Sequence, residues 1–174
     1  MALSRKSAVS FGLTLLLAGV LMWRVAPHLR VYQVDVGDRA PSFELADDSG
    51  SGARLDDFRG KYVLLNFWAT WCGPCVQEVP SLNTLQDQFA ANGLVVLGIS
   101  VDENKEAYDQ FLDRFDVTFP TVRDPEMTVA SRYGTSIYPE SYLIDRDGRV
   151  VRKYIGPENW MSPEIVNYLR SLLL

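Results

Sequence analysis

The stretch YVLLNFWATWCGPC at positions 62–75 places a pair of cysteines directly after an apolar run. The run Tyr62–Trp68 is almost continuously apolar, which is typical of a strand buried on both faces of a sheet. A helix is expected to follow Cys72, because a proline such as Pro74 is tolerated in a first helical turn. The segment therefore predicts a buried strand, a short connection that carries Cys72, and a helix.

Cys72 and Cys75 are the two cysteines of the chain. A CxxC pair is compatible with half of a metal site, a structural disulfide or a redox pair. At a helix N-terminus the free amides and the helix dipole stabilise a thiolate, so we expect Cys72 to be the nucleophile. Cys75 would then resolve the mixed disulfide that Cys72 forms with a partner.

Outside this stretch, short apolar runs alternate with helical patterns, and a polar segment at 47–52 is typical of a hairpin turn. This order predicts an α/β fold with a central mixed sheet flanked by helices and an N-terminal β-hairpin extension. The other expected strands are Leu94–Val101, Ser141–Ile144 and Val150–Tyr154, and the other expected helices are Asn104–Phe115, Met127–Tyr133 and Ser162–Leu173.

Charge is unevenly distributed along the 174 residues, whose formal net charge is −5. Residues 1–30 contain basic residues and no acidic ones, so the remaining body of the chain is more acidic than the total indicates. Such a body repels phosphate backbones, which argues against nucleic-acid binding. A hydrophobic fraction of 47% fits one globular domain with an appendage.

The appendage is an uncharged, mostly apolar segment between Lys6 and Arg24. Its length and its basic flanks predict a single transmembrane helix in a bacterial cytoplasmic membrane, with the domain on the periplasmic or extracytoplasmic side. A cleaved signal peptide is the alternative, although no A-x-A site follows. We expect a cytoplasmic N-terminus at 1–6, an anchor at 7–26, a tether at 27–35 that contains His28, and a folded domain at 36–174.

Four motifs stand out along the chain: GDRAPSF at 37–43, FRGK at 58–61, NFWATWC at 66–72 and PESYLID at 139–145. Together they resemble the membrane-anchored TlpA/ResA/CcmG-like thiol-disulfide oxidoreductases of the thioredoxin superfamily. The resemblance covers about Val36 to Leu174 and implies a thioredoxin-like fold that exchanges disulfides with client proteins, among them apocytochrome c. It also implies that a membrane electron donor protein reduces the Cys72–Cys75 disulfide again after each reaction. This redox-active disulfide is the only redox group that the resemblance implies, with no further cofactor.

The resemblance also assigns a substrate-binding groove beside the cysteines. It implies that Pro139 is cis and faces the cysteine pair, where a missing N–H leaves neighbouring backbone groups free for an extended client. The alternatives are a strand-initiating proline, a surface charge at Glu140 and a core position for Trp71. The expected groove residues are Trp71, Gly73, Pro74, Tyr138, Pro139 and Glu140.

Glu78 follows Cys75 by three residues and lies on nearly the same face of the expected helix. A carboxylate whose pKa is raised by burial can exchange a proton with Cys75 near neutral pH. Without the resemblance, a solvated surface glutamate is the ordinary expectation. ResA-like members carry a glutamate here, whereas the aspartate of typical thioredoxins, six residues before the first cysteine, is Asn66 in this chain.

Two other functions share parts of this pattern. A peroxiredoxin-like peroxidase would place a threonine three residues before its attacking cysteine, whereas Thr70 stands two residues before Cys72. A copper chaperone of the Sco type would need CxxxC and a histidine, whereas the only histidine is His28 in the expected tether. We therefore expect no metal site and favour the oxidoreductase, with a purely structural disulfide as a further alternative.

Overall fold

The computed structural model describes residues 15–24, 33–46 and 52–174. The chain divides into two compact units, residues 1–32 and 33–174. In the first unit, residues 15–24 are helical, and no helix within the described ranges has the length and apolarity needed to cross a bilayer. Most of the predicted anchor and tether, including His28, lies outside the described residues, so the division at 6, 26 and 35 stays a prediction.

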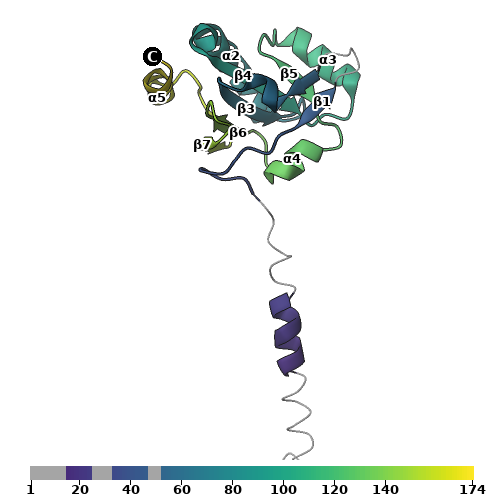
Figure 1. Cartoon of the computed structure of the whole chain (residues 1–174). Helices are drawn as coiled ribbons and strands as arrows, with labels where there is room; N and C mark the ends of the chain where they lie inside the picture. The colour runs from purple at the N-terminus through teal and green to yellow at the C-terminus, as the bar shows by residue number, and fades with distance from the viewer. Residues whose placement is uncertain (1–14, 25–32, 47–51) are drawn as a thin grey trace, which may run out of the picture. The chain divides into compact units, whose positions relative to one another are not determined.

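The second unit is built on a five-stranded mixed sheet with the strand order β5-β4-β3-β6-β7 (Figure 1). The central strand β3 runs parallel to β4 and antiparallel to β6, and it is buried along almost its whole length, as predicted. The strands are β3 (Tyr62–Trp68), β4 (Leu94–Ser100), β5 (Thr121–Arg123), β6 (Glu140–Ile144) and β7 (Val150–Ile155). A separate antiparallel pair, β1 (Glu44–Ala46) and β2 (Gly52–Arg54), confirms the N-terminal hairpin extension.

Helices cover both faces of the sheet (Figure 1). Because successive side chains of a strand point to opposite faces, Leu65 and Phe67 pack on the side of α3 and α4, whereas Leu64 packs on the side of α5 and most of α2. The α-helices of this unit are α2 (Gly73–Phe89), α3 (Lys105–Arg114), α4 (Thr128–Tyr133) and α5 (Pro163–Leu173), with 3₁₀ turns at Leu55–Phe58 and Ala90–Asn92. The predicted helices and strands are confirmed to within one or two residues at their ends.

Strand β5 was not predicted from the sequence. It spans three residues, and of these only Val122 is fully buried. Its pairing with the end of β4 is the contact that makes it a strand. Such a short segment has no periodicity from which the sequence alone could identify it.

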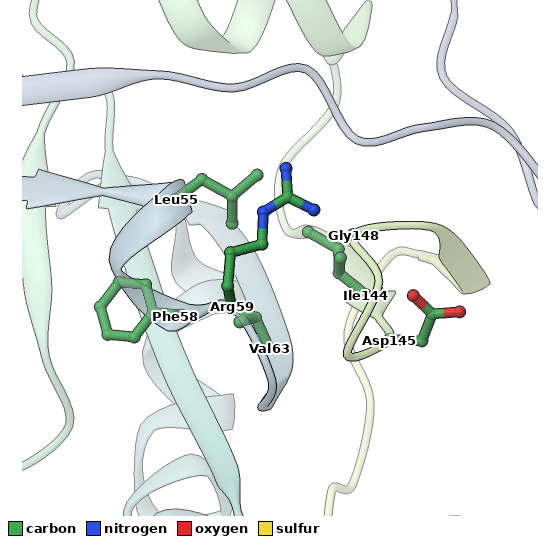
Figure 2. A pocket seen from close by; sticks show the side chains of 7 residues that line it. All are labelled: Leu55, Phe58, Arg59, Val63, Ile144, Asp145 and Gly148. Atoms are coloured by element: carbon green, nitrogen blue, oxygen red, sulfur yellow. The ribbon is translucent and has the colours of Figure 1, made fainter.

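The end of the sheet away from the cysteines is closed by Arg59 (Figure 2). Its guanidinium donates to the carbonyl oxygen of Asp147 at 2.7 Å and to the Asp56 carboxylate at 2.9 Å. The turn between β6 and β7 favours glycine at position 148, because its φ of +82° is strained for residues with a Cβ, whereas the nearby guanidinium is the movable end of a flexible side chain. The hollow beneath has a volume of about 10 Å³, which is too small for an organic ligand.

Candidate active site

Cys72 and Cys75 form a disulfide at the start of α2, with their Cα atoms 5.3 Å apart. Cys72 is the N-cap residue of this helix, and its Sγ accepts a hydrogen bond from the backbone N–H of Cys75 at 3.3 Å. Both cysteines are buried, whereas Gly73 and Pro74 between them are exposed. The pair therefore occupies the helix N-terminus that the sequence predicts, where amides and the helix dipole stabilise a thiolate.

The connection between β3 and α2 is fixed to the end of β4 by Asp102. This buried carboxylate accepts hydrogen bonds from the backbone N–H of Thr70 at 2.9 Å and from its hydroxyl at 2.7 Å. The hydroxyl of Ser100 donates to the same carboxylate at 2.5 Å. The hydroxyl of Thr70 therefore bonds to Asp102. In a peroxidase, a threonine three residues before the attacking cysteine would be expected instead, so the contacts of Thr70 do not support that alternative. Sequence analysis missed Asp102, whose position after an apolar strand was its only signal.

The peptide bond between Tyr138 and Pro139 is cis, as the resemblance implies. Glu140 pairs with Phe67 in the register of β6 and β3, so Pro139 lies at the end of the sheet from which the chain leads to Cys72. This position agrees with a proline beside the cysteine pair. The simple alternative, a strand-initiating proline, describes its place in β6 equally well, and the two readings are compatible.

An exposed apolar rim lies beside this end of the sheet. Trp71 is 68% exposed, and its ring is 5.9 Å from that of Tyr138 in an edge-on arrangement. The Tyr138 hydroxyl donates to the sulfur of Met127 at 3.9 Å, and Ile137 is 62% exposed. We call these four residues the apolar rim. The core position considered for Trp71 is wrong, whereas Trp68, three residues earlier, is indeed buried.

Glu140 is buried, so the surface charge considered for it is wrong. Its carboxylate forms an ion pair with the ammonium of Lys153 at 3.0 Å. The same ammonium donates to the carbonyl oxygen of Val34 at 3.2 Å and lies 5.2 Å from the centre of the Tyr142 ring. The side chain of Glu140 thus ties β6 to β7 and to the segment before β1, while its backbone is paired with Phe67 of β3 and Ile155 of β7.

Glu78 is also buried, one helical turn after Cys75, so the solvated alternative is wrong. Its Oε1 accepts hydrogen bonds from the backbone N–H of Glu158 at 2.8 Å and from the indole N–H of Trp160 at 2.9 Å. Its Oε2 accepts a longer bond from Asn66 at 3.4 Å. Asn66, which stands where typical thioredoxins have aspartate, therefore remains part of the site as a neutral donor.

Burial raises the pKa of Glu78 from its ordinary value of 4.5 to about 7. The three hydrogen bonds favour the charged carboxylate and limit this rise, whereas the negative charge of Glu158 adds to it. A carboxyl group with a pKa near 7 exists in both protonation states at neutral pH, which is the property a proton donor and acceptor needs. Glu158 and Trp160 lie about eighty residues further along the chain, and sequence analysis missed both.

A surface groove of about 370 Å³ reaches Glu78 from the side of the segment that follows β7. Pro80 and Ser81 of α2 form one wall, and residues 157–159 form the other. Glu78 is among the residues that line this groove, although only 1% of its surface is exposed. Among the described residues, no three histidine, cysteine, aspartate or glutamate side chains gather in a group that could hold a metal ion.

A disulfide at the N-terminus of a helix that follows the central strand of a mixed sheet, next to a cis-proline, defines a thioredoxin-like thiol-disulfide oxidoreductase. Comparison with solved structures supports this class of protein. A Chlorobium tepidum protein assigned as thiol:disulfide interchange protein DsbE is 32% identical with a TM-score of 0.76, covering 82% of this chain and 100% of that one. The thioredoxin domain of a Bacteroides vulgatus thiol-disulfide oxidoreductase has a TM-score of 0.72 at 25% identity, with coverage of 82% and 100%.

Sequence comparison narrows the class. The model of the AhpC/TSA family matches residues 36–153. Thiol-disulfide oxidoreductase ResA of Geobacillus thermodenitrificans is 42% identical over 80% of this chain and 79% of the relative. ResA of Bacillus subtilis is 37% identical over 71% and 69%. The chain accordingly belongs to the AhpC/TSA family and to the ResA-like thiol-disulfide oxidoreductases of the thioredoxin superfamily.

The raised pKa of Glu78 makes the stability of the fold depend on pH. Since the folded-state pKa lies above the unfolded value, this group stabilises the fold below pH 4.5, and that stabilisation is lost as the pH rises through 7. We expect Glu78→Gln to stabilise the fold relative to the unchanged protein, and to do so more strongly at high pH. The gain in the free energy of unfolding should be larger at pH 8 than at pH 5 by about 2–3 kcal/mol. Urea unfolding at both pH values measures this difference. Glu126→Gln at an exposed position is the control, and an equal effect of both variants would contradict the burial of an ionisable Glu78.

Proposed function

We propose that this thiol-disulfide oxidoreductase reduces disulfides of client proteins outside the cytoplasm. The observation that carries the proposal is the placement of the Cys72–Cys75 disulfide at a helix N-terminus with the buried Glu78 one turn behind it. This arrangement combines an attacking thiol with a nearby proton acceptor for the resolving thiol. The exposed Gly73–Pro74 turn and the apolar rim leave room for a client beside Cys72.

The proposed reaction begins with the reduced dithiol. The Cys72 thiolate attacks one sulfur of a client disulfide, and the other client sulfur leaves as a thiolate that takes a proton from solvent. Cys75 then gives its proton to the Glu78 carboxylate and attacks the Cys72 sulfur. The bond between Cys72 and the client breaks, the second client sulfur leaves, and two electrons have passed from the cysteine pair to the client.

Glu78 acts on Cys75 in this sequence because both lie on one face of α2. A thiol with an ordinary pKa is mostly protonated at pH 7, so a base beside it raises the fraction that can attack. The protonated Glu78 then returns its proton through the groove or, when the disulfide is opened again, to the departing Cys75 thiolate. The same group thus serves both directions of exchange.

The setting of the reaction is also proposed. Residues 7–26 would anchor the chain by a single pass in a bacterial cytoplasmic membrane, with the domain on the periplasmic or extracytoplasmic side. The uncharged segment between Lys6 and Arg24 supports this placement. A membrane electron donor protein would recharge the pair through thiol exchange at Cys72, and apocytochrome c in cytochrome c maturation is the proposed client, as the resemblance to TlpA/ResA/CcmG-like proteins implies.

A trapping experiment tests the roles of the two cysteines. We expect Cys75→Ser to accumulate a mixed disulfide with an apocytochrome c peptide that carries an oxidised cysteine pair, because the resolving thiol is absent. Non-reducing electrophoresis and mass spectrometry identify the adduct and its sulfur. Cys72→Ser is the matched variant and is expected to form none. Trapping through Cys75 in Cys72→Ser alone would reverse the assigned roles.

The direction of electron flow follows from the reduction potential of the full chain equilibrated with dithiol buffers. A value of about −250 mV or below would place the pair with thioredoxin-like reductants and support the proposal. A value near −120 mV would mark a disulfide donor and overturn the direction. In either case the trapping result still reports which cysteine attacks.

The apolar rim generates a prediction about client contact. Since Trp71 is 68% exposed and adjoins Cys72, we expect Trp71→Ala to slow the reduction of a client protein by about 3- to 10-fold. The reduction of a small disulfide such as oxidised glutathione should change by less than about twofold, because it needs no apolar contact. Val36→Ala removes an exposed apolar side chain at the opposite end of the sheet, next to Val150, and is the control. Equal slowing of both substrates would assign Trp71 to the chemistry instead.

A further inference from the structure

The segment Gly156–Trp160, between β7 and α5, supplies both donors to one oxygen of Glu78. The backbone N–H of Glu158 and the indole N–H of Trp160 converge on Oε1. A second contact holds the segment to α2, since the backbone N–H of Trp160 donates to the hydroxyl of Ser81 at 3.4 Å. That hydroxyl in turn donates to the carbonyl oxygen of Glu78 at 2.8 Å. The segment is thus attached to Glu78 at its carboxylate and at its backbone.

The indole is itself held firmly. Trp160 is 1% exposed and lies in the core cluster shared by α2 and α5. Its ring is 5.0 Å from that of Tyr154 in an edge-on arrangement. A donor fixed by packing on all sides keeps its direction when the acceptor changes charge, so its hydrogen bond can orient the carboxylate without rearrangement.

The two oxygens of Glu78 are therefore unequal. Oε1 has two donors below 3.0 Å, whereas Oε2 has the bond from Asn66 at 3.4 Å. The Nδ2 of Asn66 has two hydrogens and donates to both partners, but its bond to the hydroxyl of Ser141 is 2.9 Å long, so the 3.4 Å bond to Oε2 is the weaker of the two. With Oε1 occupied by donors that cannot accept a proton, the proton must reside on Oε2.

We propose that Trp160 is a positioning residue of the exchange reaction, whose indole N–H holds Oε1 of Glu78 so that Oε2 takes and returns the proton of Cys75. The inference rests on the proposed proton transfer by Glu78. It adds the residue that orients the carboxylate, and it makes the pH dependence of exchange a property of the packing between β7 and α5.

Other groups around Glu78 influence its charge as well. Glu158 faces it with a negative charge from the same segment as Trp160. From β3 and β6 the neighbouring side chains, Asn66 and Ser141, are neutral. On α2 itself Cys75 is the neighbouring titratable group in the reduced form. Trp160 is thus the side-chain donor whose removal changes the hydrogen bonding of Oε1 without changing any formal charge.

The test is Trp160→Phe in the full chain, with the rate of client reduction measured from pH 5.5 to 9. Loss of a hydrogen bond to the charged form favours the protonated carboxyl, so we expect the midpoint of the pH profile to move to higher pH. At pH 7 the rate should fall by about 3- to 10-fold and should recover towards pH 9. Tyr154→Phe, which keeps the ring contact with the indole, is the matched control and should leave the profile unchanged.

A double variant separates positioning from a structural role. In the Glu78→Gln background, Trp160→Phe should have no further effect on the pH profile, because the group through which it acts is gone. Equal slowing at every pH, or the same slowing in both backgrounds, would overturn the inference. If Trp160→Phe does not fold, replacing the indole by the isosteric benzothiophene removes the N–H alone and provides the same test.

The outcome also distinguishes this inference from the proposed function. If Glu78→Gln itself leaves the pH profile unchanged, the proton role of Glu78 fails and the inference fails with it. If Glu78→Gln removes the dependence on pH near 7 while neither Trp160→Phe nor the benzothiophene variant moves it, the inference alone fails. A profile that moves with Trp160→Phe and stays still in the double variant supports both.

Discussion

The hydrogen bonds of the buried Glu78 carboxylate connect the parts of this domain that otherwise share little. One side chain on α2 accepts bonds from β3, through Asn66, and from the segment before α5, through Glu158 and Trp160. Through Asn66 and Ser141 the same network reaches β6, which begins beside the cis-proline. A carboxylate without these donors would be expelled from the core by its desolvation cost, so the site exists only when all of these elements are in place.

The cysteine turn depends on a second, smaller anchor on the other side. Asp102 holds Thr70 by two hydrogen bonds and so fixes the connection that carries Trp71 and Cys72. Between this anchor and the Glu78 network the first turn of α2 has little freedom, yet Gly73 and Pro74 remain exposed. Rigid support beneath an open turn suits a reaction in which two sulfur atoms must meet in line and a protein-sized partner must approach.

Local patterns in the sequence predicted the helices and strands well, but they did not predict the long-range polar contacts. The run Tyr62–Trp68 and the CGPC pair identify β3 and the start of α2, because burial and helix-terminus chemistry leave signals within a few residues. The partners of Glu78 were invisible, since a tryptophan and a backbone amide about eighty residues away carry no mark of their target. Glu140 and Glu78 look alike in the sequence as acids near the site. Only the structure shows that Glu140 is paired with Lys153, whereas Glu78 has no such cation beside it among the residues that the structure describes.

That difference between the two glutamates bears on the role of Glu78. An ion pair such as that of Glu140 keeps a buried charge in place, whereas Glu78 is given only neutral donors, and its pKa rises to about 7. The ionised form then costs the fold about 3 kcal/mol above neutral pH, which a glutamine at this position would not. Glutamine keeps an acceptor for Trp160 and Glu158 but exchanges no proton. A destabilising titratable group at a position where a neutral isostere would fit points to chemistry that only the titratable group performs, which is the proton transfer proposed for Glu78.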